Sequence, residues 1–176
     1  MAIAAELQSI SSQDGDGSIA YGIHREVITF SATGVNAGAG IGLVPYQLKP
    51  EESGALIIFA SLTGNLVVLP TPVKGMWFEF INELARTSNE TKIVTKIVAS
   101  EFMLGTIISA SETVAEGMDC FTANGTNVVS ISMNGTTTGG EVGSRFVFTA
   151  LSTTQWLIKG VNQGSGGAVV DPFSTS

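Results

Sequence analysis

Few residues in this chain have the types and spacing that chemistry requires. His24 is the only histidine, and it lies beside Arg25 and Glu26 at the start of a predicted strand. A single histidine excludes a histidine-based metal cluster, and any catalytic triad would depend on this one ring. The sequence therefore favours a histidine at the exposed end of a strand over a catalytic histidine.

Two glycine-rich segments superficially resemble ligand-binding loops. Residues 14–18, DGDGS, alternate carboxylates with glycine, but the bidentate glutamate that an EF-hand needs at its twelfth position is Arg25 here. A turn is therefore favoured over a loose cation site completed by a neighbouring subunit. Residues 38–42, GAGIG, lack the Lys and Ser/Thr of a phosphate-binding loop.

The remaining reactive side chains give no complete catalytic set. Cys120 is the only cysteine, so an internal disulfide is excluded, and we predict a small buried apolar residue rather than a nucleophile. The chain has 15 carboxylates, but no pair that we would assign to a small hydrolase. We predict no enzymatic activity, no cofactor, and no catalytic, cofactor-binding or metal-binding residue.

The charge balance limits the partners. The net charge is −7 and the eight basic residues are scattered, whereas nucleic acids and anionic membranes attract clustered Lys and Arg. The longest clean apolar run, residues 55–60, is as long as a strand and much shorter than a membrane span. No secretory signal is recognised at residues 1–12. We expect no nucleic-acid or membrane partner, and synthesis in a cytoplasm.

Length and composition predict a single domain that assembles. A chain of 176 residues can bury one sizeable core. Only 13% of the residues are charged and the mean hydropathy is positive, so a monomer would expose large apolar patches. This composition favours an oligomer or a larger assembly.

Alternating apolar residues predict roughly ten short strands. Residues 55–60 are apolar on both faces, which predicts a central strand, with residues 66–69 as its hairpin partner. Residues 76–82 place Trp77 and Ile81 on the second face of a strand. That face is closed either by a subunit interface or by a second intramolecular layer. Further strands are predicted at residues 24–32, 41–48, 92–99, 102–110 and 118–123.

Residues 125–160 predict three more strands, with a tight reversal at residues 153–154 and a Thr/Gly loop at 134–143 that forms an exposed rim. The fold prediction is an all-β, single-domain antiparallel β-sandwich or jelly roll. It comprises an N-terminal arm (1–22), a β-sandwich domain (23–161) and a C-terminal Gly/Ser-rich arm (162–176). The predicted interface residues, on the arms and the second face, are Ile3, Leu7, Ile10, Trp77, Ile81, Val169, Val170 and Phe173.

Several motifs in these segments recur together in one class of proteins. They are an Asn-Gly-Thr loop at residue 134, a GG-x-x-G-S step from residue 139, an S-x-x-x-W-x-I-x-G strand from residue 152, and a Gly/Ser tail ending in Pro-Phe. With GALIIFA from residue 54 and GMWFEFI from residue 75, the chain resembles small tailed-phage virion proteins over roughly residues 54–173. That class includes capsid decoration (cement) proteins and some tail-fibre modules. The resemblance implies a β-sandwich or jelly roll, usually trimeric, without enzymatic activity.

The resulting expectation is a non-enzymatic virion structural protein on the capsid surface. As a homotrimeric decoration protein it would stabilise the phage head by bridging subunits of the major capsid protein. The alternative is a tail-fibre, spike or other receptor-binding module that recognises glycan. The number of copies per particle separates these two functions.

Overall fold

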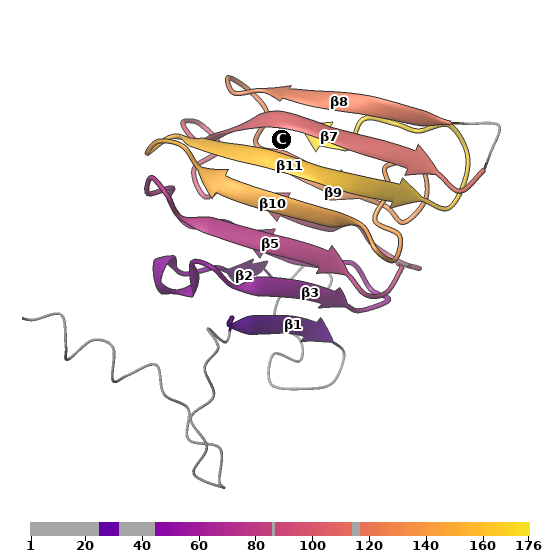
Figure 1. Ribbon diagram of the computed structural model, residues 1–176, viewed down its shortest axis with the longest axis horizontal. Helices are drawn as coiled ribbons and strands as arrows, with labels where there is room; N and C mark the ends of the chain where they lie inside the picture. The colour runs from indigo at the N-terminus through magenta and orange to yellow at the C-terminus, as the bar shows by residue number, and fades with distance from the viewer. Residues whose placement is uncertain (1–24, 32–44, 86, 114–116) are drawn as a thin grey trace, which may run out of the picture.

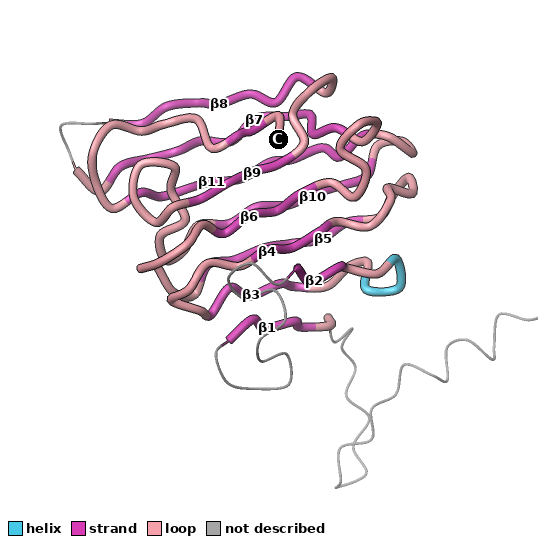
Figure 2. Tube along the Cα trace, turned by 180° about the vertical axis from the view of Figure 1, so that it is seen from behind, coloured by secondary structure: helices cyan, strands magenta, loops and turns pink. Residues whose placement is uncertain are grey.

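The computed structural model describes residues 25–31, 45–85, 87–113 and 117–176, and twelve strands in this part of the chain form two mixed sheets. The sheets lie in two layers, with the large sheet nearer the viewer in Figure 1 and the small sheet nearer in Figure 2. The all-β prediction is confirmed. The strands are β1 Val27–Ser31, β2 Pro45–Gln47, β3 Leu56–Ala60, β4 Leu66–Val68, β5 Trp77–Asn82, β6 Thr91–Val94, β7 Phe102–Ser111, β8 Met118–Asn124, β9 Ser130–Met133, β10 Arg145–Ala150, β11 Gln155–Gly164 and β12 Phe173–Ser174.

The first six strands alternate between the two layers. β1, β3 and β5 lie side by side and parallel in the large sheet, and β2, β4 and β6 do the same in the small sheet. The connections also stack, because Thr63 and Ser88 form a parallel bridge and the Gly64 amide donates to the Ser88 carbonyl at 2.8 Å. The chain therefore winds in successive coils, each with one strand in either layer.

The predicted hairpin between residues 55–60 and 66–69 is wrong. These residues contain β3 and β4, which lie in different sheets, and the residues between them cross from one layer to the other. Gly64 lies at this crossing, where an added Cβ would be 2.1 Å from the Glu90 carbonyl oxygen, so the crossing packs tightly on the next coil. Residues 55–60, apolar on both faces, predict a central strand that is covered on both sides. Its central position is confirmed, because β3 lies between β1 and β5, but among the described residues another strand covers only its core side.

The second half of the chain pairs mostly antiparallel. β10 joins β5 and β11, β8 joins β7, and β9 joins β6, while β11 and β7 are parallel. Among the described strands five pairings are parallel and five are antiparallel. The prediction of an antiparallel fold is therefore wrong for the coiled first half. A period-two pattern identifies a strand but does not reveal its partner or direction.

The core lies between the layers and is rich in aromatic side chains. The rings of Phe59 and Phe80 are 5.8 Å apart, and those of Phe80 and Phe148 are 5.3 Å apart, so β3, β5 and β10 are joined by one aromatic row. From the sequence, Phe146, Phe148 and Trp156 are predicted to be core residues rather than site residues, and the structure confirms this, since each is 0% exposed.

The two sheet edges carry one confirmed prediction and one error. A proline ring restricts a strand to an edge, so Pro45 predicts an edge position for the strand at residues 41–48. β2, which begins at Pro45, does lie at the edge of the small sheet. Cys120 is exposed, which contradicts the prediction of a buried residue. It lies in β8, the edge strand of the large sheet, on the side away from the core.

Of the two predicted arms, the structure describes only the C-terminal one. The N-terminal arm, residues 1–22, lies outside the described residues, together with Ile3, Leu7 and Ile10. At the other end, β11 continues to Gly164, across the predicted boundary between residues 161 and 162. Beyond it, β12 pairs with β9, and the Val170 amide donates to the Thr137 carbonyl at 3.0 Å. The C-terminal residues therefore contact the small sheet of their own chain.

Candidate functional site: the outer face of the large sheet

The side of the large sheet that faces away from the small sheet, here called the outer face, is largely apolar. Its residues alternate with core residues along each strand, and the register places Ile58 beside Ile81. Trp77, Ile108 and Val161 are 39%, 38% and 49% exposed. No other strand of the described ranges lies over this face (Figure 1). The large apolar members are Val27, Leu56, Ile58, Trp77, Ile81, Phe102, Leu104, Ile108, Met118, Val147, Leu157 and Val161.

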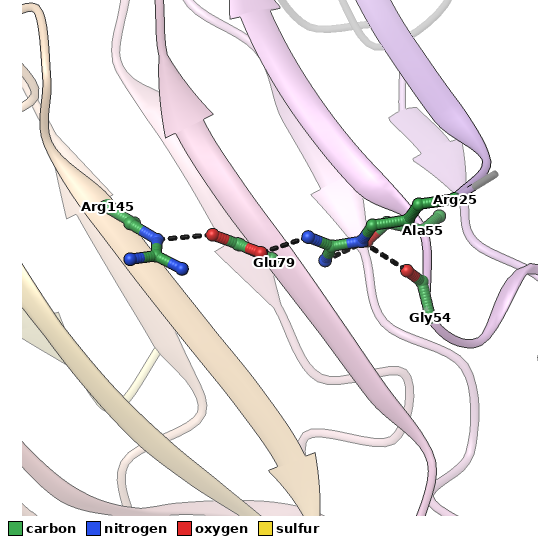
Figure 3. Close-up of polar contacts among 5 residues, drawn as sticks. All are labelled: Arg25, Gly54, Ala55, Glu79 and Arg145. Carbon is green, nitrogen blue, oxygen red and sulfur yellow. Dashed lines mark hydrogen bonds and ion pairs between the residues drawn. The ribbon is translucent and has the colours of Figure 1, made fainter. Parts of the chain in front are cut away.

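A buried carboxylate lies within this apolar surface. Glu79 is 6% exposed and accepts hydrogen bonds from Nη1 of Arg25 on one carboxyl oxygen and from Nε of Arg145 on the other (Figure 3). Arg25 donates further to the Gly54 carbonyl at 2.5 Å and to the Ala55 carbonyl at 3.0 Å. These bonds join the start of β1, the turn before β3, the middle of β5 and the start of β10.

The same arginine covers the exposed tryptophan. The guanidinium carbon of Arg25 lies 4.5 Å from the centroid of the Trp77 ring, which is cation–π geometry. Trp77 is therefore fixed against its own sheet on the side that Arg25 occupies. The rest of the ring contributes to the exposed apolar surface.

The two arginines determine the charge of Glu79. Burial raises the pKa of the Glu79 carboxyl, but the hydrogen bonds from Arg25 and Arg145 and the charges of these arginines together lower the pKa below its ordinary value. The carboxylate stabilises the fold above the unfolded-state pKa of about 4.3. This contribution is lost as the pH falls through the lower folded-state pKa.

We expect Glu79→Gln to lower the free energy of unfolding at pH 7 by about 1–3 kcal/mol, because two charge-assisted hydrogen bonds are weakened. The difference from wild type should shrink below about pH 4, where the wild-type carboxyl also becomes neutral. Urea unfolding at pH 7, 5 and 3 measures this. Glu51→Gln, at an exposed position, is the control and should leave stability nearly unchanged. A Glu79→Gln difference that is constant with pH would contradict the assignment.

The opposite surface of the molecule is smaller and mixed, with Leu66, Val68 and Val94 beside polar side chains. On the outward side of the small sheet, the Ser132 hydroxyl donates to the Glu90 carboxylate at 2.5 Å, and the Ser130 hydroxyl donates to the Ser176 carbonyl at 3.0 Å. Lys92 also lies on this side, in register with Ser132. The outer face of the large sheet is therefore the better candidate for a contact surface.

The structure brings together two of the predicted interface residues. Trp77 and Ile81 lie on the outer face, and no strand among the described residues lies over them. Their role in a subunit interface stays a prediction. Val169 and Val170 lie in the loop before β12, and Phe173 packs half-buried against the core. The outer face and the C-terminal residues are therefore separate surfaces.

The sequence analysis missed the charged centre of the outer face. Glu79 carries a sequence signal, because it is the one charged residue within the apolar run WFEFI. Its partners Arg25 and Arg145 are 54 and 66 residues away, and only the strand register brings them to Glu79. Lys159 is placed on the same face by its pairing with Val147.

A second polar pair has a structural role. The Tyr46 hydroxyl donates to the Glu52 carboxylate at 2.8 Å, and burial, followed by the hydrogen bond and charge of Glu52, raises the pKa of Tyr46 to about 12. The same carboxylate accepts the Lys49 amide at 2.6 Å, so the pair holds the 3-10 turn Pro50–Glu52 against β2. A phenol with this pKa stays protonated at neutral pH.

The described ranges lack two other functional features, a cluster of metal-binding side chains and a membrane-spanning helix. No group of three or more His, Cys, Asp or Glu side chains is placed there to hold a metal ion. The same ranges contain no helix long and apolar enough to cross a membrane.

Comparisons with protein-family models, with curated proteins and with solved structures find no match to this chain. No family is therefore assigned by similarity. The functional argument depends on the outer face and on the features of the sequence.

Proposed function

We propose that this chain is a non-enzymatic virion structural protein, a trimeric capsid decoration protein that bridges subunits of the major capsid protein on the surface of a phage head. Its two layers would then be the sandwich or jelly roll of that class. The observation that carries the proposal is the outer face, an apolar surface across the large sheet with several side chains more than a third exposed.

The physical argument concerns the size and chemistry of this surface. Monomeric soluble proteins rarely expose contiguous apolar patches larger than a few hundred Å². Here the outward residues of β3, β5, β10, β11 and β7 are mostly apolar, and only 13% of the chain is charged. Covering such a face with protein removes apolar area from water, at about 25 cal/mol for each Å². The face therefore favours a permanent assembly over a transient contact.

A structural protein also fits the way in which the face is built. Its single buried carboxylate is neutralised by two arginines, and its exposed tryptophan is held by one of them. A prearranged contact surface loses little conformational entropy when a partner binds. On a capsid, the same contact is repeated at every site, so a modest affinity per contact is multiplied.

The test combines assembly with copy number. We expect Val161→Lys to weaken self-association at least about tenfold, because it places a charge on the covered face, a change of about 1.4 kcal/mol. Val73→Lys is the matched control, since Val73 is also exposed but lies in the loop before β5. Sedimentation equilibrium measures both variants, and quantitative mass spectrometry counts the copies on purified phage particles that carry the chain.

The results of these measurements distinguish the proposed function from its alternative. A monomer at all concentrations, or equal effects of the two substitutions, would overturn assembly through the outer face. A trimer present at hundreds of copies per particle supports a decoration protein. A few tens of copies or fewer would instead favour the tail-fibre or receptor-binding alternative. The outer face gives little support to that alternative, because Arg25 occupies one side of the exposed Trp77 ring, on which a sugar would stack.

A further inference from the structure

We propose that the outer face of each copy binds residues 1–24 of a neighbouring copy. This inference rests on the proposed function, because it names what joins the subunits of the trimer. The contact would be heterologous, since a face on one copy meets a different segment of the next, and three such contacts close a ring.

The first argument is the charge of the face. Arg25, Arg145 and Lys159 contribute three positive charges and Glu79 contributes one negative charge, so the face has an excess of two positive charges. The whole chain has a net charge of −7. The outer face is therefore a basic and apolar surface on an acidic protein, and it favours a partner that is both acidic and apolar.

Hydrogen-bond donors of Arg145 and Lys159 on this face can bind the carboxylates of a partner. Nε of Arg145 is bound to Glu79, while its two Nη atoms have no bond to the residues drawn in Figure 3, and the side chain is 61% exposed. A guanidinium in this position presents a fork that matches a carboxylate. Lys159 adds an exposed ammonium on the neighbouring strand β11.

The third argument is the composition of residues 1–24. This segment contains no Lys or Arg, and its charged side chains are Glu6, Asp14 and Asp16. It also carries large apolar side chains on both sides of the polar stretch at residues 11–18. It thus has the acidic and apolar character that the face favours. The apolar members are Met1, Ile3, Leu7, Ile10, Ile19, Tyr21 and Ile23.

The fourth argument is where this segment joins the described chain and how far it reaches. It ends at Arg25, whose side chain is fixed on the outer face by Glu79. Extended, 24 residues span at most about 80 Å. The seven strands of the large sheet, spaced about 4.8 Å apart, are about 29 Å wide. The segment is long enough to leave its own sheet and cross the face of a neighbour.

The experiment uses tryptophan quenching as a direct readout of the face. The chain has two tryptophans, and Trp156 is 0% exposed while Trp77 is 39% exposed, so acrylamide reaches only Trp77. We expect full-length protein to show concentration-dependent protection of Trp77 that follows trimer formation. Removal of residues 1–24 should abolish both the protection and the trimer. Trp77→Phe is the control that identifies the quenched residue.

A charge-reversal pair distinguishes a neighbouring copy from the same chain. Lys159→Glu reverses the charge at one position and lowers the excess on the face from two positive charges to zero, without touching the Glu79 cluster. The double variant Asp14→Lys, Asp16→Lys changes the segment from three negative charges to one positive charge. Each variant alone should assemble about three- to tenfold more weakly at low salt. Mixing the two should restore association in part, because the changed segment of one variant then matches the changed position on the face of the other. In a ring of three, two of the contacts are then matched and one stays mismatched.

Each result has a defined consequence. Restoration in the mixture, together with loss of Trp77 protection on truncation, supports the inference. A trimer that persists unchanged without residues 1–24 overturns this inference and leaves the proposed function standing. Protection that is independent of concentration, without restoration in the mixture, means that the segment covers its own face, which also overturns the inference. A full-length chain that stays monomeric overturns the proposed function itself.

Discussion

Replacing Phe80 with alanine should lower the free energy of unfolding by about 3–5 kcal/mol. Phe80 is 0% exposed and lies in the middle of the aromatic row, with its ring 5.8 Å from that of Phe59 and 5.3 Å from that of Phe148. The substitution removes the ring from β5, to which β3 and β10 are paired on either side. Neighbouring strands cannot close the gap without losing their register, so a cavity remains.

Chemical unfolding followed by circular dichroism measures this loss. Phe102→Ala is the matched control, because it removes the same atoms from β7 at a half-buried, outward position. We expect the control to cost about 1 kcal/mol. Equal losses for the two variants would contradict the placement of the aromatic row between the layers.

The aromatic row shows what could be predicted from the sequence. The alternation of Phe146 and Phe148 with the less apolar set Arg145, Val147 and Thr149 identifies both the strand and its better-buried face, and the structure confirms both. The reversal at residues 153–154 follows from the same local pattern. Local periodicity contains this information because burial alternates along each strand, whichever strand lies beside it.

The coiled first half could not be predicted in the same way. A hairpin and a coil both require two apolar strands joined by a short connection, and β3 and β4 satisfy either arrangement. The deciding interactions are between coils, such as the bridge from Thr63 to Ser88. These contacts join residues far apart in the sequence, so no local pattern reveals them.

In the candidate site, too, a local pattern reveals some residues, whereas only the order of the strands in the sheet reveals the others. Trp77 and Ile81 were predicted as interface residues because they share the second face of one strand. The charged centre of that face requires β1, β5 and β10 to be neighbours in register, since Arg25, Glu79 and Arg145 come from three separate segments. Once the sheet order is known, an isolated glutamate in an apolar strand becomes the most informative residue of the face.

The loop at residues 134–143 was predicted as an exposed rim, and the structure instead holds much of it in place. Asn162 of β11 is 0% exposed and binds this loop with its side-chain amide. Its Oδ1 accepts the Gly140 amide at 2.8 Å, and its Nδ2 donates to the Thr138 carbonyl at 3.0 Å and to the Ser109 hydroxyl at 3.2 Å. The loop is therefore exposed only in part, at Thr136, Val142 and Gly143. Its own sequence does not reveal the anchor, because Asn162 lies about twenty residues later.

Asn162→Ala should therefore lower the free energy of unfolding by about 2–4 kcal/mol, because it leaves buried donors and acceptors without partners. The Gly140 amide should also exchange its hydrogen faster, since it loses its acceptor. Chemical unfolding and amide hydrogen exchange measure these two effects.

Gln163→Ala is the control on the same strand, because Gln163 is exposed, and it should change stability by less than about 0.5 kcal/mol. Normal protection of Gly140 in Asn162→Ala would show that the loop is held by other contacts. The bonds within the loop, such as the Thr136 amide to the Asn134 side chain at 2.8 Å, would then be sufficient. Loss of Gly140 protection at wild-type stability would instead show that Asn162 orders the loop without supporting the sheets.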